Sequence, residues 1–170
     1  MSTENRDVIS EMYAERVSNP LEWFKHSISL LAAARATKER ADVLIDVLEK
    51  SDLDNVATML YGFSIENLFK ALWTFKKFGA PHANEWIPIA EFPDELKTHD
   101  LTKLSLLIDK RIAEEYDFSL SMLTETTIWA GRYPCSIKGD EGSIGRFSDK
   151  VHSDAESIFK SYSKPFTAIC

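Results

Sequence analysis

Residues 56–78, VATMLYGFSIENLFKALWTFKKF, decide the fold of this chain. One set of apolar side chains recurs every three or four residues, the spacing that places them on one face of an α-helix. These residues are Tyr61, Ile65, Leu68, Leu72 and Phe75. Further large apolar residues cover much of the remaining surface: Met59, Leu60, Phe63, Trp73 and Phe78. Because a helix that is apolar almost all round is buried, we expect this one at the centre of a helical bundle.

The ends of this helix carry recognisable signals. Ser51 or Asp52 is a suitable N-cap, and Gly79 stands where a left-handed residue commonly ends a helix. Further helices are expected over residues 4–17, 20–49, 101–112, 119–130 and 144–162. The pattern predicts a single all-α domain over residues 1–170, an antiparallel helical bundle of four main helices plus accessory short helices.

The composition excludes several classes of protein. The chain has 170 residues, with 27 acidic and 20 basic side chains and a net charge of −7, so broad coating of nucleic acid is disfavoured. The two cysteines, Cys135 and Cys170, form no CxxC, which fits a reducing cytoplasm better than a disulfide framework. We expect a cytoplasmic protein with no signal peptide and no contact with a membrane.

Two charged residues interrupt the central helix. Glu66 and Lys70 stand four residues apart in the order that favours an ion pair. Burying them costs free energy unless each is satisfied, so they are either a structural pair that fixes helix register or a polar site inside the bundle. His99 is a third candidate for binding, although Thr98 or Asp100 beside it is expected to cap the next helix.

No metal and no cofactor are expected. His82 and Glu85 supply only two ligands, and the carboxylates Glu114, Glu115 and Asp117 lack the paired-helix spacing of a two-metal bundle site. No glycine-rich phosphate loop follows a predicted strand, and no GxSxG segment is present.

Three short segments resemble one known family. They are YGFSIENLFKAL at residues 61–72, HDLTKL at 99–104 and WAGRYP at 129–134. In this order and rough spacing they resemble the HEPN family, the prokaryotic and eukaryotic nucleotide-binding helical domain. The resemblance covers about residues 56–134, and the last helix is a plausible completion.

The resemblance implies an antiparallel helical bundle, often a homodimer, that is associated with RNA or nucleotides. Many members of the family are metal-independent ribonucleases of toxin or defence systems, whose site is an Arg and a His separated by a short interval and completed across the dimer. Here five residues lie between Arg146 and His152. In such a pair the His moves a proton to or from the ribose 2′-hydroxyl and the Arg stabilises the phosphorane.

The helical geometry leaves the role of this pair open. Six residues turn an unbroken helix by about 600°, so Arg146 and His152 would stand about 120° apart. They converge only if the helix begins after Gly145 or if a second chain supplies a partner. Otherwise Arg146 is a surface residue and His152 lies at the boundary of the core. Arg132 lies beside Tyr133 in the third segment. Three roles are open to it: capping helix carbonyls, pairing with Glu66 or binding phosphate.

Two functions therefore follow from the sequence. The first is a non-catalytic or weakly catalytic module of a stress or defence system that binds RNA, a nucleotide or a partner protein. The alternative is a metal-independent endoribonuclease that uses Arg146 and His152 at a dimer interface.

Overall fold

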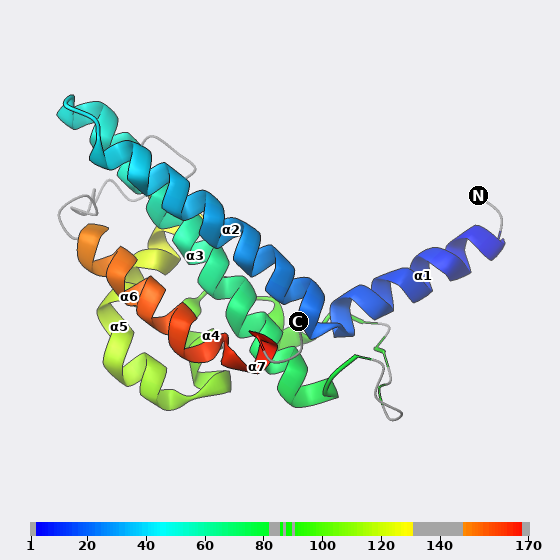
Figure 1. Cartoon of the computed structure of the whole chain (residues 1–170). Helices are drawn as coiled ribbons and strands as arrows, with labels where there is room; N and C mark the ends of the chain where they lie inside the picture. The colour runs from blue at the N-terminus through cyan, green and yellow to red at the C-terminus, as the bar shows by residue number, and fades with distance from the viewer. Residues whose placement is uncertain (1–2, 82–85, 87, 90, 131–147, 168–170) are drawn as a thin grey trace.

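The computed structural model describes residues 3–81, 86, 88–89, 91–130 and 148–167, with the backbone alone for residues 3–7, 129 and 130. Within these residues the chain is all-α, as predicted, and forms no strand (Figure 1). The elements are α1 (Thr3–Ser18), α2 (Pro20–Asp42), α3 (Val47–Phe78), the 3-10 turn η1 (Asp94–Leu96), α4 (Leu101–Ile108), α5 (Lys110–Glu125), the π-helical turn η2 (Thr126–Ala130), α6 (Ser148–Tyr162) and α7 (Lys164–Thr167).

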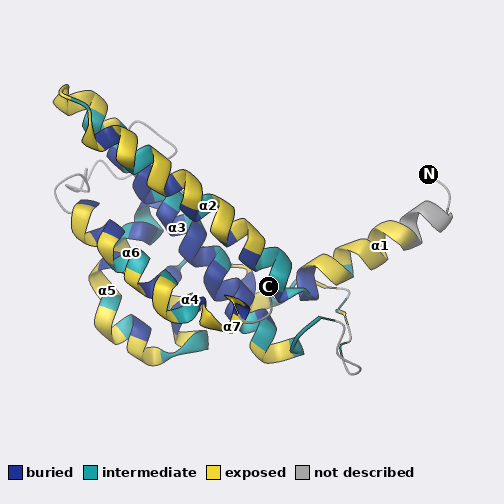
Figure 2. Ribbon diagram, viewed as in Figure 1, coloured by how far each residue is buried: buried dark blue, intermediate teal, exposed yellow. Residues whose placement is uncertain are grey.

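Helix α3 is the central element, as its apolar periodicity predicts. It packs against α2, α4, α5, α6 and η2, and its middle turns are buried (Figure 2). Ile65, Leu68 and Phe69 are fully enclosed. Helices α2 and α3 lie side by side in opposite directions and form a long hairpin, and α4 to α6 cover the far side of α3 (Figure 1).

Local caps explain where α2 and α3 begin and end. Asn19 Oδ1 accepts the Leu21 N–H at 2.9 Å, and Pro20 occupies the first turn of α2, where its missing N–H costs nothing. Gly79 ends α3 as predicted, with φ at +79° and its N–H donated to the Phe75 carbonyl at 2.8 Å.

The predicted start of α3 at Ser51 or Asp52 is wrong. Asp46 Oδ1 accepts the N–H groups of Leu48 and Glu49, both at 2.9 Å, so the helix begins about one and a half turns earlier. The boundary between the next two helices also differs from the prediction. Asp109 caps α5 by accepting the Arg111 N–H at 3.0 Å, and it thereby separates α4 from α5.

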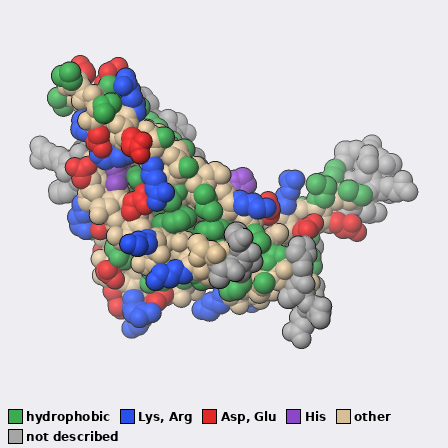
Figure 3. Space-filling model, in the orientation of Figure 1, with side chains coloured by type: hydrophobic (Ala, Val, Ile, Leu, Met, Phe, Trp, Pro, Cys, Tyr) green, Lys and Arg blue, Asp and Glu red, His purple; other side chains and the backbone are tan. Residues whose placement is uncertain are grey.

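The molecule exposes apolar side chains at two opposite ends. Helix α1 leads away from the bundle, and the turn between α2 and α3 forms the other extremity (Figures 1 and 3). On α1 the exposed residues are Val8, Ile9, Met12 and Tyr13, and at the α2–α3 turn they are Val43, Ile45, Val47 and Leu48. No helix in the described part of the chain is both long and apolar enough to span a bilayer.

Candidate functional site

Glu66, Lys70 and His99 form one polar cluster, which we call the Glu66 cluster. Glu66 and Lys70 are each only 5 % exposed, and Lys70 Nζ donates to Glu66 Oε1 at 2.7 Å. His99 Nδ1 lies 3.0 Å from Glu66 Oε2 and 3.1 Å from Oε1. Both carboxylate oxygens therefore have partners, which is what a buried charge requires.

The start of α4 fixes the position of His99. Asp100 accepts the Lys103 N–H at 3.0 Å, and Thr98 Oγ1 accepts the Asp100 N–H at 3.1 Å. The predicted cap therefore forms, and His99 contacts Glu66 in addition. The His99 side chain is 56 % exposed, so it links the buried pair on α3 to solvent.

Two aromatic rings enclose the Lys70 ammonium group. Its nitrogen lies 5.6 Å from the centre of the Trp23 ring and 6.0 Å from that of Phe92, both within cation–π range. The two rings meet edge to face at 5.9 Å. Trp23 is further held by its indole N–H, which donates to the Val17 carbonyl at 3.0 Å.

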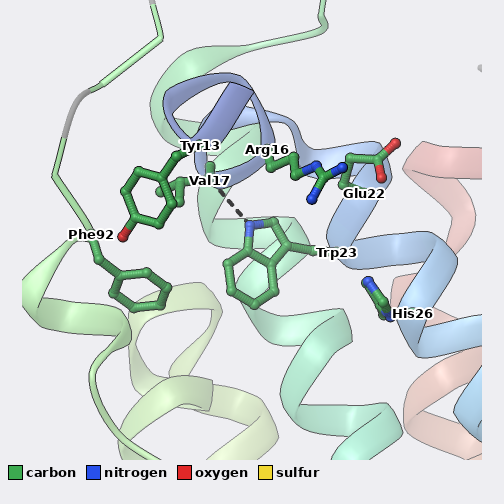
Figure 4. Close-up of a pocket in the computed structure, with 7 residues that line it drawn as sticks. All are labelled: Tyr13, Arg16, Val17, Glu22, Trp23, His26 and Phe92. Atoms are coloured by element: carbon green, nitrogen blue, oxygen red, sulfur yellow. Dashed lines mark hydrogen bonds between the residues drawn. The ribbon is translucent and has the colours of Figure 1, made fainter. Parts of the chain in front are cut away.

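Trp23 and Phe92 also line a cavity of about 520 Å³ at the junction of α1 and α2, which we call the α1–α2 cavity. In Figure 4, Tyr13 and Phe92 lie on one side of Trp23 and His26 lies on the other. The complete lining is Tyr13, Arg16, Val17, Glu22, Trp23, His26 and Phe92.

His152 belongs to a second cluster, which it forms with Thr58 and Tyr61 and which we call the His152 cluster. The Thr58 hydroxyl donates to the Asp54 carbonyl at 2.7 Å and lies 2.8 Å from His152 Nε2. Because that hydroxyl has one proton, Nε2 must donate to it, and Nδ1 then carries a lone pair. Nδ1 is buried and has no hydrogen-bond partner among the described residues.

The surroundings of His152 keep its ring neutral. Its side chain stacks on the Tyr61 ring with the ring centres 4.8 Å apart, and the residue is only 4 % exposed. Burial, followed by the nearby charge of Lys38, lowers the pKa of His152 to about 4. The expectation that His152 lies at the boundary of the core is wrong, because its position on α6 turns it toward α3.

Hydrogen bonds through Glu156 connect the Tyr61 side of the His152 cluster to the protein surface. The Tyr61 hydroxyl donates to Glu156 Oε1 at 3.0 Å, and burial together with that carboxylate raises the pKa of Tyr61. Arg35 donates two hydrogen bonds to Glu156, at 2.7 and 2.6 Å. The Arg35 hydrogen bond also lowers the pKa of Glu156, so the carboxylate stays ionised.

A row of polar or small residues along α3 carries both clusters. Its members recur every four residues and are all buried: Asp54, Thr58, Gly62, Glu66, Lys70 and Thr74. Glu66 and Lys70 are predicted from the sequence, but Thr58 is not, although this regular spacing within an apolar helix was its signal. Trp23, a large aromatic residue directly before the apolar Phe24, is not predicted either.

The structure therefore brings together Glu66, Lys70 and His99, but it places His152 two turns of α3 away from them. Arg132, Tyr133 and Arg146 lie outside the described residues. In the described part of the chain, no three His, Cys, Asp or Glu side chains gather closely enough to bind a metal ion. Comparisons with protein-family models, with curated proteins and with solved structures found no match.

Proposed function

We propose that this chain is a HEPN-like domain of a stress or defence system that binds RNA or a nucleotide without cleaving it. The segments at residues 61–72 and 99–104, which carry the resemblance, meet through Glu66 and His99. The all-α fold with a buried α3 is the kind of fold that the resemblance implies. Partner proteins and a second copy of the chain belong to the same proposal as additional binding partners.

The burial of His152 carries the non-catalytic part of this proposal. A general base must approach the proton that it removes to within about 3 Å, and its pKa must lie near the working pH. His152 is 4 % exposed, Thr58 occupies Nε2, and the pKa of the ring is lowered to about 4. A ribose hydroxyl would reach this ring only if α3 and α6 separated.

The direct test measures RNA binding and RNA cleavage on the full chain in the same buffer, with EDTA present. Fluorescence anisotropy of a labelled single-stranded RNA reports binding, and gel electrophoresis of the same RNA reports cleavage. We expect binding that weakens with added salt and no cleavage by the wild type. Absence of binding to both RNA and mononucleotides would refute the proposal.

One observation favours the ribonuclease as a second candidate. His152 Nδ1 is buried without a partner among the described residues, and a catalytic role is one of the explanations for such an atom. In this candidate, Nδ1 accepts the 2′-hydroxyl proton and Arg146 stabilises the phosphorane across a homodimer. His152→Gln and Arg146→Ala would then each abolish metal-independent cleavage without weakening RNA binding, and light scattering at micromolar concentration would show a dimer.

A further inference from the structure

The α1–α2 cavity has the size and lining of a site for a small organic ligand. Its volume of about 520 Å³ is in the range of small-molecule sites in proteins. Three aromatic rings, those of Tyr13, Trp23 and Phe92, contribute flat apolar surface (Figure 4). Such rings favour a flat aromatic ligand, because offset-stacked and edge-to-face arrangements of rings are attractive.

The aromatic wall is held in place before any ligand arrives. The Trp23 indole N–H is bonded to the Val17 carbonyl at 3.0 Å, and Phe92 contacts the indole ring edge to face. A wall fixed by such contacts loses little conformational freedom on binding, which favours affinity. Tyr13 lines the same cavity and is 44 % exposed, so its ring is accessible to a ligand.

The charges around the cavity select the sign of the ligand. Glu22 accepts a hydrogen bond from Lys25 at 2.7 Å, and this bond lowers the pKa of Glu22, so a cation already compensates its charge. Arg16 is a second cation at this cavity; it is exposed, and its charge also lowers the pKa of Glu22. Two cations, Arg16 and Lys25, therefore stand against the one carboxylate of Glu22, so the local excess of charge is positive.

A cationic ligand is disfavoured for a second reason. Aromatic rings beside a carboxylate often bind ammonium groups. Here the Lys70 ammonium group already lies 5.6 Å from the Trp23 ring centre and 6.0 Å from that of Phe92. These two rings therefore already bind one cation, Lys70, and a second cation would have to share the same ring electrons.

We propose that the α1–α2 cavity binds a small molecule that combines a flat aromatic ring with an anionic group, the ring between Trp23 and Tyr13 and the anion on Arg16. An aromatic carboxylate and a nucleoside monophosphate share this chemistry. The site does not require that the chain bind RNA, and longer RNA does not fit into its volume.

Isothermal titration calorimetry on the full chain tests the proposal with two matched pairs of probes. Indole-3-acetate and tryptamine share a ring and differ in the sign of their charge, whereas AMP and adenosine differ by the phosphate. We expect at least one of the two anions to bind with a dissociation constant below about 1 mM, and to bind about tenfold more tightly than its partner. Which anion binds more tightly identifies the source of the ligand.

Variants locate the ligand in the cavity. Arg16→Gln is expected to weaken the anion about tenfold, to leave the binding of uncharged adenosine unchanged and not to weaken that of cationic tryptamine. Arg40→Gln, which removes the same charge from the exposed far end of α2, is the matched control and should change nothing. Tyr13→Ala should weaken both members of a pair, because it removes ring contact and no charge.

Three results would overturn the proposal. They are the absence of binding by both anions at millimolar concentration, tighter binding of tryptamine than of indole-3-acetate, and equal effects of Arg16→Gln and Arg40→Gln. None of these results depends on the RNA-binding assay. RNA binding by a chain whose cavity binds neither anion would refute the cavity site alone, whereas AMP binding that Arg16→Gln does not weaken would leave the proposed nucleotide function standing without this cavity. Circular dichroism of each variant confirms that the helices are retained.

Discussion

The Glu66 cluster and the His152 cluster both contact α3 and both bury an ionisable side chain, but the two side chains are stabilised in opposite ways. Glu66 is enclosed, and both of its carboxylate oxygens contact cationic or hydrogen-bonding groups of Lys70 and His99. His152 is equally enclosed, but its contacts are a hydroxyl and an aromatic ring, and Nδ1 has no partner among the described residues. The Glu66 cluster therefore balances a buried charge with an opposite charge, whereas the His152 cluster keeps its ionisable side chain neutral.

This difference shows that the neighbours of a buried ionisable group affect its charge state more than its degree of burial does. The exposed fractions of Glu66 and His152 are almost the same, 5 % and 4 %. Opposite charge within hydrogen-bond distance favours the ionised form of a buried group, whereas burial without such a charge favours the neutral form. Removing a charged partner should therefore lower the free energy of unfolding most at the Glu66 cluster. At the His152 cluster, the free energy of unfolding should instead depend on pH.

The largest effect is expected from Glu66→Ala. This substitution leaves the Lys70 ammonium group buried beside two aromatic rings without a carboxylate, which typically costs about 3–5 kcal/mol. Urea unfolding followed by circular dichroism measures the loss. The double variant Glu66→Leu with Lys70→Met should be less destabilised than Glu66→Ala, because it leaves no unpaired charge. If the double variant is the less stable of the two, charge compensation is not what the cluster provides.

The second prediction concerns the pH dependence of stability at His152. The folded pKa is about 4 and the ordinary value is 6.5, so below pH 6.5 the unfolded chain takes up a proton that the folded chain does not. The contribution of the neutral ring is fully present above pH 6.5 and is lost as the pH falls through 4. Relative to His152→Gln, the wild type should therefore lose roughly 3 kcal/mol between pH 7 and pH 4.

Matched urea titrations of the wild type and His152→Gln at several pH values check this prediction. Carboxylates titrate in both proteins, so only the difference between the two free energies of unfolding reports His152. A difference that stays constant across this range would mean that the ring is accessible to protons in the folded protein.

The third prediction concerns Gly62, which separates the two clusters on α3. A Cβ atom at this position would overlap Thr127 Cγ2 and lie 3.0 Å from the Leu123 carbonyl oxygen. Gly62→Ala should therefore push η2 away from α3 and cost about 1–3 kcal/mol. Thr127→Ser removes the methyl group and keeps the hydroxyl that donates to the Thr124 carbonyl. Adding Thr127→Ser to Gly62→Ala should recover part of the loss, and no recovery would mean that the Leu123 backbone sets the limit.

The smallest effect is expected at the surface end of the His152 cluster. Arg35 and Glu156 form a bidentate ion pair, but their side chains are 51 % and 34 % exposed. Arg35→Gln should cost less than about 1 kcal/mol, and most of that difference should disappear in high salt. A loss comparable to that of Glu66→Ala would contradict the distinction between exposed and buried partners.

Local patterns in the sequence predict the positions of the helices, but they do not predict contacts between segments that are distant along the chain. The apolar repeat of residues 56–78 and the glycine at 79 identify the central helix and its end, because both signals act within one helix. The start of α3 was missed, since Asp46, Ser51 and Asp52 are all competent caps and only the packed structure chooses among them. The Glu66–Lys70 pair follows from its spacing along one helix.

The contacts that complete each cluster could not be predicted in this way. His99 is 33 residues from Glu66, and His152 is 94 residues from Thr58, so both contacts depend on the path of the chain between helices. Periodicity places His152 near the edge of the apolar face of α6, but it does not show that Tyr61 covers the ring. The α1–α2 cavity likewise depends on the angle between two helices, which no local pattern specifies.

The contact between Glu66 and His99 has a consequence for the substitutions that this protein can accept during evolution. It joins two of the short segments that carry the family resemblance: a change at His99 removes one contact of the Glu66 carboxylate, whereas a change at Glu66 or Lys70 alone leaves the other charge unpaired in the interior. Substitutions at positions 66, 70 and 99 should consequently be inherited as a group, and a descendant that replaces the acid with an apolar residue should also have replaced the amine.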